Sequence, residues 1–314
     1  MTYKEANDIF NLPFMELLYK AHTIHRESFN PNSLQTSTLL SVKTGSCTEN
    51  CSYCAQSAHY KTNTQKENML DKEQILKYAK AAKDKGSSRF CMGASGRSPS
   101  DKEIESICEV IGEVKNLGME TCVTLGLLNE AQAKKLKDSG LDFYNHNIDT
   151  SREYYSNVIT TRTFEDRLET IKCVRDAGLK ICVGGILGMG ESNKDRINML
   201  VLLANLPIQP ESIPINQLVR IPGTPLENGS ELDCFDFVRI IALARILMPK
   251  SYIRLSAGRA QMEDSLQALC FFAGANSVFY GDKLLTTKNS APSHDDMLFA
   301  RLNLNKEVFL EANA

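Results

Sequence analysis

The chain has 314 residues, of which 42% are hydrophobic and 24% are charged, and its formal net charge is −2. This length is enough for one large core or two smaller domains, and the composition is that of an ordinary globular protein. The small net charge provides no basic field for nucleic acid or for an anionic membrane surface, so we expect neither as a partner.

The chain begins MTYKEANDIF, without the apolar core of a signal peptide, and the longest apolar helix pattern, residues 237–248, is too short to cross a bilayer. We therefore expect a cytoplasmic protein, in which thiols stay reduced. Its ten cysteines are then core residues, metal ligands or nucleophiles rather than disulfide partners.

The first thirty residues predict an amphipathic helical segment, which ends at Asn30-Pro31 because a residue before proline disfavours the helical conformation. Beyond it, short apolar runs rich in β-branched or aromatic residues predict strands. There are eight such runs, at residues 38–43, 89–93, 120–126, 143–149, 180–187, 212–219, 252–257 and 277–280.

Helix patterns with recognisable ends separate these runs, and several begin with a capping box and end at a glycine. The starts are Asp71 with Gln74, Ser100 with Glu103, Asn129 with Gln132, and Thr163; the ends are Gly86, Gly118, Gly140 and Gly178. Eight strand and helix units over about 250 residues predict a (β/α)8 TIM-type barrel, with an open doubly wound sheet as the alternative. We expect an N-terminal helical segment at 1–31, the barrel at 32–282, and a tail at 283–314 that covers one barrel end.

A cluster of three cysteines, Cys47, Cys51 and Cys54, follows the first predicted strand. Three thiols within eight residues can converge on one metal centre from a single loop. A structural zinc site would need a further ligand pair, although His59 is near, and a low-potential ferredoxin would need four thiolates in other spacings. Three thiolates on a four-iron cluster leave one iron open to a small ligand, as a catalytic cluster requires.

The C-x3-C-x2-C spacing, with Tyr53 before the last cysteine, resembles the signature of the radical S-adenosylmethionine enzymes. In that family a 4Fe–4S cluster binds the methionine part of S-adenosylmethionine and cleaves the sulfonium to a 5′-deoxyadenosyl radical. Residues 184–191, GGILGMGE, resemble the element that supports the adenine in the same family. The resemblance implies cofactor contacts from Tyr53, Ala94, Asn147, Asp149, Arg167, Ile186 and Glu191. For Arg167, an exposed helix arginine is the alternative.

Polar residues share one face of several predicted strands. Cys122 and Thr124 alternate with aliphatic neighbours, and Arg254 stands between Ile253 and Leu255. Because helices cover the outer face of a barrel, we expect the polar face to point inward. A buried arginine needs a partner, so an anionic or metallic object inside the barrel is predicted. Four strands supply its candidate ligands, Cys91, Cys122, Cys182 and Arg254.

Three strand cysteines with an arginine resemble the ligand set that holds a 2Fe–2S cluster in the biotin synthases. Residues 144–150 (YNHNIDT), 160–162 (TTR) and 252–259 (YIRLSAGR) are also similar to that family. The resemblance implies a sulfurtransferase that converts dethiobiotin to biotin, with the second cluster as sulfur donor. It also implies an electron donor of the flavodoxin or ferredoxin type, and the N-terminal helix suggests a homodimer.

Contacts with the substrate are assigned by its chemistry. Carboxamides suit the cyclic urea of dethiobiotin, and hydroxyl or backbone donors suit its carboxylate. The candidates are Asn145, Asn147 and Asn216 for the urea, and Thr286 and Thr287 for the carboxylate. Two alternatives remain open: another radical S-adenosylmethionine enzyme related to the hydrogenase-maturation proteins, or a non-catalytic iron–sulfur electron carrier or zinc-binding module. The other four cysteines fall in helix patterns and are expected to be core residues.

Overall fold

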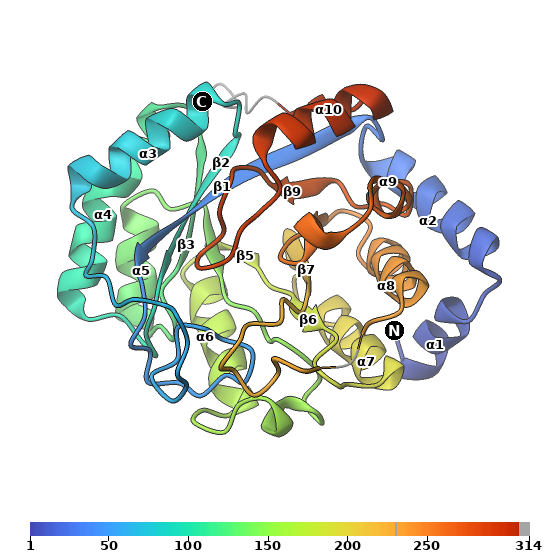
Figure 1. Cartoon of the computed structure of the whole chain (residues 1–314), viewed down its shortest axis with the longest axis horizontal. Coiled ribbons are helices and arrows are strands. Elements are labelled where there is room, and N and C mark those ends of the chain that lie inside the picture. The colour runs from blue at the N-terminus through green and yellow to red at the C-terminus, as the bar shows by residue number, and fades with distance from the viewer. Residues whose placement is uncertain (230, 308–314) are drawn as a thin grey trace.

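The computed structural model describes residues 1–229 and 231–307. The expected N-terminal helical segment consists of two helices, α1 (Tyr3–Phe10) and α2 (Phe14–Ser28). Thr2 and Glu5 form a capping box at the start of α1. Helix α1 packs against α7 (Asn193–Ala204) and α8 (Cys234–Leu247), and α2 packs against α8, so the pair lies outside the ring of strands (Figure 1).

Strands and helices then alternate along the rest of the described chain, with short 3-10 turns at Tyr155–Asn157 and Arg259–Gln261. The elements are β1 (Ser33–Lys43), α3 (Lys72–Asp84), β2 (Arg89–Ala94), α4 (Asp101–Asn116), β3 (Glu120–Thr124), α5 (Glu130–Asp138), β4 (Phe143–Asn145), α6 (Phe164–Asp176), β5 (Lys180–Cys182), β6 (Gly185–Leu187), α7 (Asn193–Ala204), β7 (Ser212–Gln217), α8 (Cys234–Leu247), β8 (Tyr252–Leu255), α9 (Asp264–Phe272), β9 (Ser277–Phe279), α10 (Pro292–Leu302) and β10 (Asn305–Lys306).

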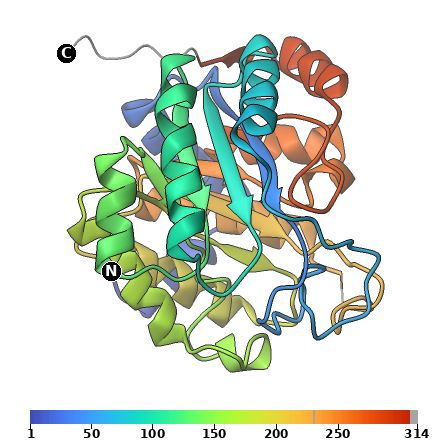
Figure 2. The ribbon, with the colours of Figure 1, turned by 90° about the vertical axis from the view of Figure 1, so that its left-hand side faces the viewer.

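The sheet closes on itself. All of its strand pairs are parallel, and β1 pairs with β2 on one side and with β9 on the other, where Gln35 lies opposite Ser277. The helices surround the strands, as the two views show (Figures 1 and 2). The fold is therefore the predicted (β/α)8 barrel, and the open doubly wound alternative is wrong.

The predicted fifth strand, residues 180–187, is two short strands instead of one. The register is unbroken, because Cys182 pairs with Ser212 and Gly185 with Ile215. Between these pairs Pro214 faces Gly184, and a proline has no N–H to donate across the gap. The approach is so close that a Cβ at residue 184 would lie 1.9 Å from the Pro214 carbonyl oxygen.

The predicted helix ends are confirmed. The side chains of Asp71, Ser100, Asn129 and Thr163 each accept a hydrogen bond from the backbone N–H three residues further on. The glycines expected at the helix ends have positive φ, for example +87° at Gly86, which a residue with a Cβ adopts at a cost. These caps fix where each loop leaves its helix.

Helix α10 follows β9 in the chain, in the place of the eighth helix of the repeat. Strand β10 pairs with the first two residues of β1. The boundary at residue 283 stays a prediction, and the last residues of the predicted tail, 308–314, lie outside the described residues. No helix in the described part of the chain is long and apolar enough to span a membrane.

Candidate active site

A cavity of about 320 Å³ opens where the strands end at their carboxyl termini. Its walls come from the loops after β1, β2, β3, β4, β7, β8 and β9 and from the strands beneath them. Of the residues predicted for the site, those that line the cavity are Cys47, Cys51, Tyr53, Cys54, Cys91, Ala94, Cys122, Asn145, Asn147, Asp149, Arg167, Ile186, Asn216, Arg254, Thr286 and Thr287. Cys182 and Glu191 are outside this lining set.

The three cysteines after β1 lie on a loop that folds back on itself. The Cys54 N–H donates to the Cys51 carbonyl at 2.9 Å, and the Cys47 N–H donates to the Gln56 carbonyl at 2.9 Å. Burial raises the pKa of the Cys54 thiol to about 12, and it also raises the pKa of Cys51. Without a metal these two thiols are therefore protonated, and a bound metal would displace the protons.

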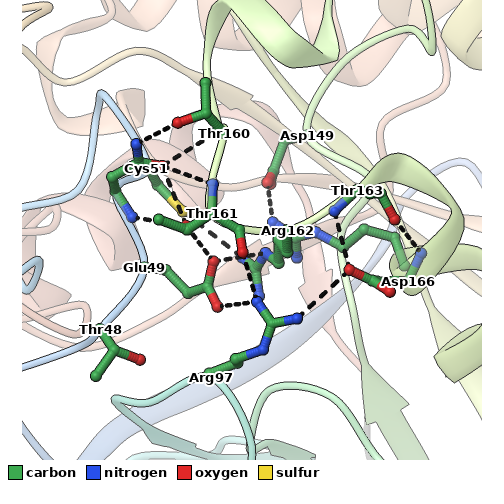
Figure 3. A network of polar contacts seen from close by, with 12 residues as sticks. Thr48, Glu49, Cys51, Arg97, Asp149, Thr160, Thr161, Arg162, Thr163 and Asp166 are labelled. Atoms are coloured by element: carbon green, nitrogen blue, oxygen red, sulfur yellow. Dashed lines mark hydrogen bonds and ion pairs between the residues drawn. The ribbon is translucent and has the colours of Figure 1, made fainter.

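Hydrogen bonds to a segment distant in the sequence hold this cysteine loop in place (Figure 3). The Asn50 side-chain oxygen accepts hydrogen bonds from the backbone N–H groups of Thr160 and Thr161, at 3.0 and 3.2 Å. The Ser52 N–H donates to the Val158 carbonyl at 3.0 Å. The segment before α6 is thus tied to the loop at three backbone positions. None of these contacts has a local signal in the sequence.

The strand cysteines come together in the interior of the barrel. Cys91 on β2 lies opposite Cys122 on β3 in the register, and both pack with Cys182 and Phe143 in one buried cluster. Arg254 reaches the cluster from β8, where its Nη1 lies 3.7 Å from the Cys182 sulfur. Alternation along the strands predicted that Cys122 and Arg254 point inward, and the structure brings them together with Cys91 and Cys182.

Arg254 is held by neutral groups. Its Nε donates to the Ser277 hydroxyl at 2.9 Å, and its Nη2 donates to the Ser37 hydroxyl at 3.1 Å and to the Gln35 side-chain oxygen at 3.2 Å. The residue is 1% exposed. In the described chain no carboxylate forms an ion pair with it. Its positive charge is therefore available to an anionic group among the cysteines, because a buried charge needs a partner.

The Cys182 thiol, beside Arg254, loses its proton more easily than an ordinary cysteine. Hydrogen bonding with Cys122, followed by the charges of Arg254 and Arg89, holds the pKa of Cys182 well below its ordinary value. Arg89 differs from Arg254, because it forms a salt bridge with Glu120 at 2.8 Å. The interior thus offers sulfur donors beside one arginine that has no acidic partner of its own.

This donor set fits iron–sulfur clusters. Within the described ranges, no three Cys, His, Asp or Glu side chains are close enough to share a single metal ion. In a four-iron cluster each thiolate binds a different iron, and in a two-iron cluster the four protein ligands are divided between two irons, so the whole ligand set is spread more widely than around a single ion. The three loop cysteines and the three strand cysteines form two such groups, one at the mouth of the cavity and one at its base.

Asp149 and Arg167, both predicted to contact the cofactor, bind each other. The Arg167 Nη2 forms an ion pair with the Asp149 carboxylate, and its Nε donates to the Tyr155 hydroxyl at 3.1 Å. Arg167 is 5% exposed, so the alternative of an exposed helix arginine is wrong. Asp149 has φ +67°, a left-handed conformation that an aspartate tolerates better than most residues. Tyr155 was missed, because nothing in its local sequence marks it.

Glu191 shapes a turn. Its two carboxylate oxygens accept the backbone N–H groups of Gly188 and Met189, at 2.8 and 2.7 Å, and an N–H of Arg196 at 2.6 Å. It therefore fixes the loop after β6, while Ile186 of the same motif lines the cavity. The sequence grouped the two residues as cofactor contacts, and the structure separates their positions.

The three asparagines are anchored to the barrel backbone. Asn145 donates to the Cys182 carbonyl at 3.0 Å, and Asn147 accepts the Gly184 N–H at 3.1 Å. Asn216 donates to the Gly185 carbonyl at 2.9 Å and accepts the Ala257 N–H at 3.1 Å. A carboxamide has two N–H donors and two acceptor lone pairs, so each retains capacity for a ligand.

Thr286 and Thr287 belong to a loop between β9 and α10 that closes one side of the cavity. The Leu284 N–H donates to the Thr287 carbonyl at 2.9 Å and makes the loop compact. Leu285 rests on Gly93 of β2, where a Cβ would lie 2.6 Å from the leucine Cδ2. The glycine therefore allows this loop to approach the barrel.

Comparisons with known proteins agree with this architecture. Residues 41–204 match the Radical SAM superfamily model, and residues 214–305 match the Biotin and Thiamin Synthesis associated domain. The solved structures of the FeFe-hydrogenase maturase HydG from Carboxydothermus hydrogenoformans and of methylornithine synthase (PylB) have TM-scores of 0.82 and 0.81. Each similarity extends over 98% of this chain, and it includes 76% of the HydG structure and 94% of the PylB structure. The sequence identity is 19% in both cases, so these structures show the fold alone. Fold and family model together define a radical S-adenosylmethionine enzyme.

Similarity to curated relatives identifies the family within this class of enzymes. Biotin synthase of Rickettsia felis is 61% identical over 303 residues, which are 96% of this chain and 98% of the relative. Biotin synthase of Lawsonia intracellularis is 61% identical over 305 residues, which are 97% of this chain and 96% of the relative. The chain belongs to the biotin synthase family. It is a sulfur-inserting enzyme whose cofactors are S-adenosylmethionine and iron–sulfur clusters.

Proposed function

We propose that the chain converts dethiobiotin to biotin with two different clusters. A 4Fe–4S cluster is bound by Cys47, Cys51 and Cys54, and a 2Fe–2S cluster by the strand set Cys91, Cys122, Cys182 and Arg254. The observation that carries the proposal is the buried Arg254 guanidinium, which lies 3.7 Å from the Cys182 sulfur and is held by neutral groups. When bound, the clusters supply the electron that cleaves S-adenosylmethionine and the sulfur that is inserted.

The protein's own part is placement. The reacting carbons of dethiobiotin are saturated, so no acid or base can remove their hydrogens at a useful rate, and the chain must hold both molecules close together. The cavity lies between the loop cysteines and the strand cysteines and includes apolar side chains such as Leu39 and Phe279. These apolar walls limit the water that could quench a reactive carbon.

S-adenosylmethionine is assigned to the side of the cavity formed by the loops after β1 and β4 and by strands β2 and β6. Asn147 and Asp149 bind the ribose hydroxyls, and Tyr53, Ala94 and Ile186 form the surrounding wall. Arg167 orients Asp149 and offers its remaining guanidinium N–H groups to the methionine carboxylate. Glu191 acts on the adenine side through the turn that it holds.

Dethiobiotin is assigned to the space above the strand cysteines. The free donors and acceptors of Asn145, Asn147 and Asn216 bind its cyclic urea. Thr286 and Thr287 bind its carboxylate from the loop after β9. Replacement of both threonines by valine should raise the KM for dethiobiotin several-fold and leave reductive cleavage of S-adenosylmethionine unchanged.

The working context is the cytoplasm, where a flavodoxin or ferredoxin supplies electrons. We also propose that the chain acts as a homodimer through its N-terminal helices. The three-part division at residues 31 and 282 remains part of this proposal. The family alternatives, a relative of the hydrogenase-maturation proteins and a non-catalytic carrier or zinc module, lack a supporting feature of their own.

Anaerobic reconstitution tests the function. The protein is loaded with iron and sulfide, its clusters are counted by Mössbauer spectroscopy, and products are measured after addition of S-adenosylmethionine, a reductant and dethiobiotin. Both cluster types and the formation of biotin with 5′-deoxyadenosine are expected. A fully loaded protein with only a four-iron centre would overturn the proposal, and so would a failure to form 5′-deoxyadenosine.

A further inference from the structure

One arginine in the network around the cysteine loop contacts a cysteine sulfur directly. Arg162 lies just before α6, and its Nη2 is 3.6 Å from the Cys51 sulfur, within the range of an N–H to sulfur hydrogen bond (Figure 3). The side chain is 8% exposed. Its Nε is buried and has no hydrogen-bond partner among residues 1–229 and 231–307. The guanidinium is thus buried beside Cys51 with unused donor capacity.

Arg162 is carried by the same segment that clamps the loop. Asn50, next to Cys51 in the chain, binds the backbone of Thr160 and Thr161 and donates to the Thr160 hydroxyl at 2.6 Å. The Thr161 hydroxyl in turn donates to the carboxylate of Glu49. These hydrogen bonds join the residues just before Cys51 to the residues just before Arg162. They therefore fix the distance between the arginine and the cysteine locally.

The carboxylate of Glu49 lies between Arg97 and Arg162 and makes its closer contact with Arg97. Glu49 is 2% exposed and forms its direct ion pair with Arg97, whose Nη1 lies 2.7 Å from Oε1. The Arg162 Nε forms a second, longer ion pair with the other carboxylate oxygen at 3.7 Å, a distance that is too long for a hydrogen bond. Because Arg162 makes no hydrogen bond to this acid in the described residues, its Nη2 remains directed at the Cys51 sulfur.

We propose that Arg162 is a positioning residue that binds the Cys51 sulfur and sets the reduction potential of the cluster assigned to this loop. The inference rests on the proposed function, because Cys51 must be a cluster ligand. Hydrogen bonds and positive charge at a ligand sulfur stabilise the reduced, more negative form of an iron–sulfur cluster and so raise its potential. Arg162 therefore makes the cluster easier to reduce by its electron donor.

The test compares Arg162→Met with a control, Arg152→Met. Both remove an arginine from the connection between β4 and α6, but Arg152 pairs with Glu165 at the surface, and only Arg162 contacts a sulfur of the loop. Each protein is reconstituted, its iron and sulfide are counted, and the midpoint potential of the four-iron cluster is measured by a redox titration followed by electron paramagnetic resonance. We expect Arg162→Met to lower the reduction equilibrium constant about tenfold, a fall of about 59 mV for one electron, and Arg152→Met to match the parent.

The outcomes separate the inference from the proposed function. Absence of a four-iron cluster in the parent protein overturns the proposed function and the inference with it. A normal cluster whose potential is unchanged in Arg162→Met overturns the inference alone, as does an equal shift in Arg152→Met. If Arg162→Met does not hold its iron, Arg162→Gln is measured instead, since it removes the charge and keeps a polar side chain. A potential equal to that of the parent would then overturn the inference.

Discussion

The two cysteine sites of this barrel are built in different ways. The loop site, Cys47, Cys51 and Cys54, is held by hydrogen bonds from Asn50 and Ser52 to a segment more than 100 residues away. The strand site, Cys91, Cys122, Cys182 and Arg254, is held by the register of the parallel sheet. Geometry at the loop site therefore depends on a few side chains, whereas geometry at the strand site is fixed by the fold. It follows that each site can be perturbed without the other.

Removal of a loop ligand should have the largest effect. Cys51→Ala takes away one of three thiolates at the mouth of the cavity, so S-adenosylmethionine cleavage should fall to background and biotin formation with it. The measurement is 5′-deoxyadenosine after incubation with a reductant. Cys108→Ala, in α4 and away from both sites, is the control and should behave as the parent. Substantial 5′-deoxyadenosine from Cys51→Ala would disprove the role given to the loop.

Removal of a strand ligand should separate the two activities. Cys182→Ala leaves the loop site intact, so biotin formation should be lost while 5′-deoxyadenosine formation stays within about tenfold of the parent. Both products are quantified in the same reaction. If this variant and Cys51→Ala lose both activities equally, the sites do not have separate roles.

Thiol alkylation of the metal-free protein sharpens the comparison. Cys47 is partly exposed, while Cys91, Cys122 and Cys182 are 4%, 1% and 0% exposed. The strand thiols lie at the base of the cavity and are almost fully covered by their neighbours, so a local opening must precede their reaction, and Cys47 should react at least about 100-fold faster. Iodoacetamide labelling followed by peptide mass spectrometry gives the rates, with the exposed Cys234 as a positive control. Similar rates at all four would mean that the strand site is not preformed.

The smallest expected effect is on how folding stability depends on pH, and it comes from His146, which lines the cavity after β4. His146 is buried, and its Nε2 has no hydrogen-bond partner in the described chain. Burial, and then the charges of Arg167 and Arg162, hold its pKa well below 6.5. The unfolded chain therefore binds a proton below pH 6.5 that the folded chain excludes, and folding stability falls as the pH decreases through this value.

The proton at His146 can be isolated by substitution. His146→Leu should make the free energy of unfolding of the metal-free protein less dependent on pH, by about 1.4 kcal/mol per pH unit below 6.5. Urea unfolding at pH 7.0 and pH 5.5 provides the comparison. An unchanged pH dependence in the variant would show that this histidine is not kept neutral by the fold.

Local patterns in the sequence predicted much of the barrel. Capping boxes such as Ser100 with Glu103 and glycines such as Gly118 mark helix ends through contacts within a few residues. Alternation along a strand was enough to place Cys122 inside the barrel. The split of the fifth strand was not predicted, because it depends on Pro214, about 30 residues away from Gly184.

Long-range contacts limited the prediction of the site. The pairing of Arg167 with Asp149 and Tyr155 and the clamp on Asn50 join segments that only the folded chain brings together. Glu191 was predicted to contact the cofactor because it belongs to the same short motif as Ile186. In the structure its carboxylate instead accepts hydrogen bonds from the backbone of the turn. Sequence spacing therefore indicated the residue types of the site better than their individual contacts.

The barrel closes only when β9 pairs with β1, so its interior is completed late during synthesis of the chain. Arg254 binds Gln35 and Ser37 of β1 and Ser277 of β9, so its surroundings join the beginning and the end of the barrel. A ribosome releases the chain from its N-terminus, and this compartment is incomplete until β9 has emerged. The loop cysteines are available early, whereas the inner compartment is assembled among the last parts of the nascent enzyme.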